Sequence, residues 1–158
     1  MKKTISVLIA VLLCLAIYPA VYAADAQTAP MPETVVAVEY FADGSYGVTT
    51  LAQAGGAGTK GKVTHTKSYT YYDADDTALW TLYLTAAFTY DGTTATCTAA
   101  SVMHLIYDNA WQVTSETAHK SGNTATGDFT VKRYFLGIPT KTINVTLTMT
   151  CSPSGVVS

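Results

Sequence analysis

Ile143-Asn144-Val145-Thr146-Leu147-Thr148-Met149-Thr150-Cys151 is the clearest element of secondary structure in the sequence. Every second residue is apolar, and every residue between is threonine or asparagine. A period of two places the apolar side chains on one face of a β-strand and the polar side chains on the other. The β-branched threonines suit the half-exposed face of a sheet. The stretch therefore predicts a strand that covers a hydrophobic core with one face.

The same period recurs upstream, between turn signals. Two further strands are expected over residues 78–90 and 94–107, with these residues on their apolar faces: Trp80, Leu82, Leu84, Ala86 and Phe88 in the first, and Cys97, Ala99, Met103 and Leu105 in the second. Asp-Gly pairs at 43–44 and 91–92 mark tight turns. No segment past the N-terminus has a helical repeat. The pattern predicts an all-β fold, a single antiparallel β-sandwich of about seven or eight strands.

The N-terminus has the pattern of a signal peptide. Lys2 and Lys3 precede an apolar run over 5–17, which is too short to span a bilayer. Cleavage is expected after Ala23, with Ala26 as the alternative. The predicted organisation is a signal peptide at 1–23, a flexible leader at 24–33 and the β-sandwich domain at 34–158. We expect a secreted, extracellular protein without membrane insertion after cleavage.

The charge of the chain excludes two classes of partner. Without Lys2 and Lys3, seven basic residues face eleven acidic ones, a formal net charge near −4. Nucleic acid binding requires clustered lysine and arginine, and the sequence has no basic block. We therefore expect no nucleic acid partner, and no attraction to an anionic membrane surface.

Two cysteines remain after the predicted cleavage. Cys97 and Cys151 both lie on apolar faces of predicted strands, so a disulfide between them would join two sheets across the core. An even number of cysteines in an exported chain favours one disulfide. Two buried free thiols are the alternative.

The order Cys97, Trp111, Cys151 resembles the cysteine–tryptophan–cysteine pattern of immunoglobulin domains. This resemblance implies an immunoglobulin-like sandwich; another sandwich or barrel topology stays open. Residues 79–158, with Cys151-Ser152-Pro153 near the end, also resemble small uncharacterised exported β-sandwich proteins of Gram-positive bacteria. Neither resemblance implies an activity.

The chemistry-bearing residues give few candidates. Asp73, Asp75 and Asp76 form the one acidic cluster, a candidate calcium site. The EF-hand pattern is excluded because Ala78 and Thr85 occupy its glycine and glutamate positions, and a solvated turn is the alternative. No histidine pair has zinc spacing, and no nucleophile elbow is present. We expect no cofactor and no enzymatic activity.

Tyrosine is abundant, with eleven residues in the chain. Tyr69, Tyr71, Tyr72 and Tyr83 form the candidate ligand surface, because exposed tyrosines give rigid amphipathic contact area. Half-buried sheet positions are the alternative. The sequence thus predicts a secreted non-catalytic binding domain for a glycan, a cell wall or a protein. The alternative is a diffusible secreted effector, such as a bacteriocin-like toxin or an inhibitor.

Overall fold

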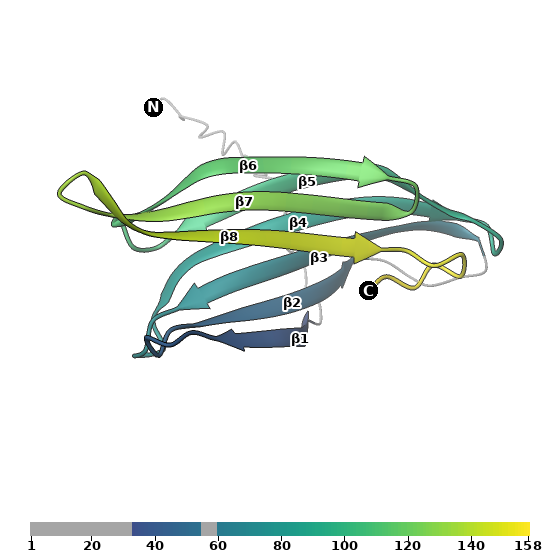
Figure 1. Ribbon diagram of the computed structural model, residues 1–158. Coiled ribbons are helices and arrows are strands. Elements are labelled where there is room, and N and C mark those ends of the chain that lie inside the picture. Colours follow the sequence, from purple (N-terminus) through teal and green to yellow (C-terminus); the bar gives the residue numbers. More distant parts are fainter. Residues whose placement is uncertain (1–32, 55–59) are drawn as a thin grey trace, which may run out of the picture.

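The computed structural model describes residues 33–54 and 60–158, which form eight strands (Figure 1). The strands are β1 (Glu33–Tyr40), β2 (Tyr46–Ala54), β3 (Gly61–Tyr72), β4 (Ala78–Tyr90), β5 (Ala95–Ile106), β6 (Trp111–Ser121), β7 (Thr124–Phe135) and β8 (Ile138–Thr150). The predicted signal peptide and nearly all of the predicted leader lie outside the described residues. No helix in the described part of the chain is long and apolar enough to cross a bilayer.

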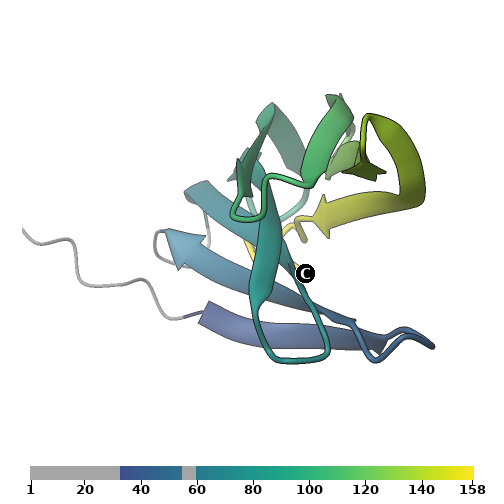
Figure 2. The same ribbon diagram turned by 90° about the vertical axis from the view of Figure 1, so that its left-hand side faces the viewer.

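The strands form two antiparallel sheets. One sheet has the order β1-β2-β3-β4-β5, and the other has the order β6-β7-β8. The two sheets face each other as layers (Figure 2). The predicted all-β antiparallel sandwich is therefore confirmed. Each strand pairs only with its neighbours in sequence, which is a meander, whereas the immunoglobulin order mixes distant strands within each sheet.

The core lies between the two layers. Strand β4 supplies its centre, because the predicted apolar stripe from Trp80 to Phe88 is buried. Phe129 and Val131 of β7 and Leu147 and Met149 of β8 belong to the same cluster from the opposite sheet. The inward face predicted for residues 143–151 is thus confirmed.

Strand β5 departs from the predicted alternation. A β-bulge shifts its register, since Phe88 pairs with Cys97 while Ala87 pairs with Ala99. A bulge inserts one extra residue and reverses which side chains face the core beyond it. Cys97 is buried as predicted, but Met103 and Leu105 are 55% and 43% exposed. The prediction that these two share a buried face with Cys97 is wrong.

The meander gives the sandwich two different ends. The connections β1–β2, β3–β4, β5–β6 and β7–β8 lie together at one end, which we call the hairpin end (Figure 1). The opposite end carries the C-terminal residues 151–158, and we call it the C-terminal end. There the chain folds back on itself, and the backbones of Cys151 and Val157 form an isolated antiparallel β-bridge.

Candidate functional site: a polar pocket at the hairpin end

A pocket of about 290 Å³ opens at the hairpin end. Its residues come from both sheets and include Asp43 and Ser45 from the β1–β2 turn, Tyr71 from β3, Asp73 and Asp75 from the β3–β4 turn, Asp108 before β6, Trp111 from β6, Arg133 from β7 and Lys141 from β8. Residues remote in sequence converge here because the meander brings four connections to one end. We call this hollow the end pocket.

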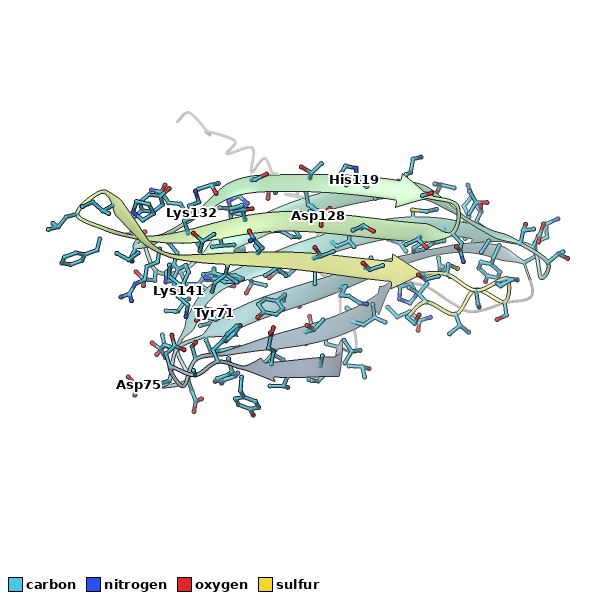
Figure 3. All side chains as sticks on the ribbon, in the orientation of Figure 1. Tyr71, Asp75, His119, Asp128, Lys132 and Lys141 are labelled. Carbon is cyan, nitrogen blue, oxygen red and sulfur yellow. The ribbon has the colours of Figure 1, made fainter. Side chains whose placement is uncertain are left out.

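Lys141 is the centre of a hydrogen-bond network in the end pocket. Its Nζ donates to Tyr71 Oη at 2.6 Å and to Asp43 Oδ2 at 2.7 Å. Ser45 Oγ lies 2.5 Å from Tyr71 Oη and also donates to Asp43 Oδ1. Figure 3 shows Lys141 and Tyr71 close together on their two strands. The network joins the first turn of the chain to the last strand.

Aromatic packing fixes the position of this network. The ring of Tyr71 is 1% exposed and stacks on Trp80, with centroids 4.9 Å apart and an interplanar angle of 10°. It meets Trp111 edge-on at 5.5 Å. Lys141 Nζ lies 5.2 Å from the centroid of the Tyr71 ring, on the hydroxyl side of the ring. Because the ring cannot turn, its hydroxyl is held at the floor of the end pocket.

The ion pair in the end pocket is charged at neutral pH. The Lys141 hydrogen bond, followed by those from Ser45, holds the pKa of Asp43 far below its usual range. Burial acts to lower the pKa of Lys141, but its hydrogen bonds to Asp43 and Tyr71 outweigh burial and raise it. Asp43 therefore remains a hydrogen-bond acceptor and Lys141 a donor over the physiological range.

Arg133 is the second cation of the end pocket. It continues the inward series of β7 that includes Phe129 and Val131, and it lies opposite Trp111 in the register of β6 and β7. Beyond the edge of the core its side chain is exposed, and its guanidinium has no hydrogen bond or ion pair among the described residues. This group is available to a ligand.

The pocket carboxylates supply acceptors. Asp73 Oδ1 accepts from the backbone N–H of Asp75 and Thr77, at 3.0 and 2.9 Å, and so shapes the β3–β4 turn. Asp108 Oδ1 accepts from Ala110 N at 2.9 Å. Each carboxylate keeps a second oxygen that can accept from a ligand.

The predicted calcium residues do not converge. Asp73 is committed to its turn, Asp75 is exposed, and Asp76 accepts a hydrogen bond from Tyr46 Oη at 2.9 Å. Within residues 33–54 and 60–158, no group of three or more His, Cys, Asp or Glu is placed to hold a metal ion. The geometry favours the alternative, a turn held by its own side chains.

The four predicted tyrosines do not form one surface. Tyr69 and Tyr71 face the core and both stack on Trp80. Tyr72 lies on the outer face and stacks on Tyr46 at 4.9 Å, and Tyr83 is half-buried on its strand. Strand alternation alone separates Tyr71 from Tyr72. The sequence analysis missed Arg133 as a site residue. Its position two residues after the inward-facing Val131 is the pattern that could have identified it.

The two cysteines are free thiols in the structure. Cys97 and Cys151 are 4% and 0% exposed, and the predicted disulfide between them is not formed. Each Sγ donates to a backbone carbonyl, that of Ala99 at 3.3 Å and that of Ser152 at 3.4 Å. Burial raises the pKa of both thiols, and the neighbouring Cys97 raises that of Cys151 further. The two sheets are therefore held together by the packing of their side chains and not by a disulfide.

The fold and the end pocket define a two-sheet antiparallel meander with a charged hollow at one end. No family model, curated protein or solved structure matches this chain. The functional argument therefore depends on the geometry of the pocket.

Proposed function

We propose that this chain is an exported, non-catalytic binding module that takes a carbohydrate in the end pocket. The observation that carries the proposal is the mixture of fixed donors and acceptors around Tyr71 and Lys141. Sugar hydroxyls donate and accept at once, so a sugar site needs both kinds of group. Arg133 and Lys141 donate, while Asp43, Asp73 and Asp108 accept.

The size and rigidity of the end pocket fit one small part of a ligand, such as a single sugar unit. Its volume of about 290 Å³ lies near the lower end of the range for ligand pockets, about 300–1,000 Å³. The stacked ring of Tyr71 and the pair Lys141–Asp43 hold the polar atoms in place before binding. A site of this kind loses little entropy when it binds, which favours one terminal or projecting sugar unit of a longer polymer.

The protonation states of the central pair support binding over catalysis. A general acid at neutral pH needs a carboxyl with a raised pKa, and a nucleophilic lysine needs a lowered one. The pKa of Asp43 is lowered and that of Lys141 is raised. Both shifts strengthen the pair as a hydrogen-bonding unit.

The test is retention on a panel of insoluble polysaccharides and purified cell walls, using residues 24–158, which keep all eight strands. Tyr71→Phe removes the hydroxyl from the network and leaves the stacked ring. Tyr69→Phe is the matched control, because Tyr69 also stacks on Trp80 but directs its hydroxyl toward Glu39. We expect Tyr71→Phe to lose retention by about tenfold, the worth of one hydrogen bond to a charged group, and Tyr69→Phe to keep it.

A second pair of variants tests the cations. Arg133→Gln and Lys132→Gln remove the same charge from adjacent positions of β7, but Lys132 does not line the end pocket. Retention should fall for Arg133→Gln alone. Equal losses in both members of either pair, or no retention on any polymer, would contradict the proposal.

A further inference from the structure

Three large apolar side chains lie at the tip of the β7–β8 hairpin. Phe135, Leu136 and Ile138 are 68%, 86% and 66% exposed. Single exposed apolar residues are common on protein surfaces, but a contiguous group marks an interaction site. We call Phe135, Leu136 and Ile138 the apolar tip.

The turn chemistry of the tip is unusual for folding alone. Leu136 and Gly137 connect the paired residues Phe135 and Ile138, and both have positive φ, at 50° and 79°. Two-residue hairpin turns with positive φ at both positions strongly prefer asparagine, aspartate or glycine at the first position. Leu136 therefore occupies a left-handed backbone position while its side chain lies in solvent. Neither backbone preference nor core packing accounts for a leucine here.

The position of the tip allows a flat surface to reach it. In Figure 1 the β7–β8 connection projects beyond the other connections of the hairpin end. A planar partner can touch the apolar tip without meeting the rest of the sandwich.

Basic residues follow directly behind the tip. Lys132 and Arg133 precede it on β7, and neither has an ion pair with any described residue. Lys141 follows on β8, paired with Asp43. Figure 3 shows Lys132 beside this hairpin. The aspartates of the end pocket, which Arg133 and Lys141 also line, belong to other connections of the chain. Three of the seven basic residues beyond Ala23 thus lie on one hairpin.

We propose that the apolar tip inserts into the interfacial region of an anionic lipid bilayer. Apolar side chains at the end of a protruding element are buried among the headgroups and upper acyl chains, and nearby cations contact anionic headgroups. Lys132 and Arg133 have aliphatic stems long enough to extend along the surface while their charges stay in water. The charge of the whole chain predicts no attraction to an anionic surface. The proposal differs because Lys132 and Arg133 lie on the same hairpin as the apolar tip, whereas the aspartates of the end pocket lie on other elements.

The test is co-sedimentation of residues 24–158 with vesicles of phosphatidylcholine alone or mixed with phosphatidylglycerol. Leu136→Asn removes the apolar side chain, and asparagine adopts positive φ readily, so the fold is retained. Val156→Ser is the matched control, because Val156 is 61% exposed at the C-terminal end. We expect Leu136→Asn to weaken binding about tenfold or more, the factor for withdrawing one leucine side chain from an apolar environment.

Two further arms separate this site from the end pocket. Lys132→Gln should weaken binding to the phosphatidylglycerol vesicles only, and its effect should vanish at high salt. Tyr71→Phe should leave vesicle binding unchanged. Equal binding by Leu136→Asn and the unmodified protein, or an equal loss in Val156→Ser, would overturn the proposal. Self-association that Leu136→Asn abolishes, without vesicle binding, would also overturn it in favour of a protein contact.

Discussion

The two ends of the sandwich are built from the same meander and differ in how they are closed. At the C-terminal end, residues 151–158 fold back over the core: Thr150 and Ser158 exchange two backbone hydrogen bonds, and Gly92 N donates to Pro153 O. At the hairpin end, polar groups meet in a pocket and the apolar tip is exposed. The C-terminal end is therefore closed by backbone hydrogen bonds, while the hairpin end exposes polar and apolar side chains to solvent.

Two glycines give the sharpest test of this difference. Gly155 and Gly137 both have positive φ, at 84° and 79°, one at each end. A Cβ at Gly155 would lie 2.4 Å from Cζ of Tyr90, whereas a Cβ at Gly137 would meet no atom within 4 Å. Gly155→Ala should lower the free energy of unfolding by about 3 kcal/mol, from overpacking and backbone strain together. Gly137→Ala should cost about 1 kcal/mol, from backbone strain alone.

Urea denaturation of both variants measures the two effects under one set of conditions. The slope with urea should be unchanged, because the surface exposed on unfolding is the same. Equal losses of stability would show that the tail does not seal the C-terminal end.

His65 lines a hollow with Gly155 and Val157 and so provides a pH test of the C-terminal end. Its ring is 4% exposed, and neither ring nitrogen has a hydrogen-bond partner. Burial lowers the pKa of His65 below 6.5. The unfolded chain therefore takes up a proton first as the pH falls, so the stability that neutral His65 contributes is present above about pH 6.5 and is lost below it.

We expect the free energy of unfolding to fall between pH 7 and pH 5, because the unfolded chain binds the proton on His65 more tightly than the folded chain does. His65→Gln should flatten this part of the stability profile. His119 is the control, since it is exposed and lies 3.9 Å from Asp128, so His119→Gln should keep the acid loss. A profile that stays steep in His65→Gln would assign the acid loss to other groups.

The sequence predicted the positions of the strands better than it predicted which strands pair in each sheet. Period-two patterning located β4 at 78–90 to the residue, because its inward series is uninterrupted. The bulge in β5 carried no sequence signal, since alanine and threonine around position 98 suit either register. The division into five and three strands was also hidden, because a meander and an immunoglobulin sandwich share the same local pattern.

The candidate site was less accessible to sequence reasoning. The sequence predicts Tyr71 as a surface residue, whereas its ring is buried and its hydroxyl accepts a hydrogen bond from Lys141 in the end pocket. Asp43 and Lys141 lie almost one hundred residues apart, and only the fold brings them together. A tyrosine satisfies either face of a strand, because its ring is apolar and its hydroxyl is polar. Composition therefore could not choose between the two faces.

The smallest expected effect concerns the thiols of the C-terminal end. Because Cys97 and Cys151 are free and buried, and because burial raises the pKa of both, they are protonated at pH 7 in the folded and unfolded chain. Adding a reductant should therefore leave the free energy of unfolding unchanged, whereas a disulfide closing this loop would contribute about 4 kcal/mol. In residues 24–158, which exclude Cys14, a thiol reagent without reductant should find two reactive groups per chain after unfolding and almost none before. If the unfolded chain does not react with the thiol reagent, Cys97 and Cys151 form a disulfide. The C-terminal end would then be stabilised by a covalent bond.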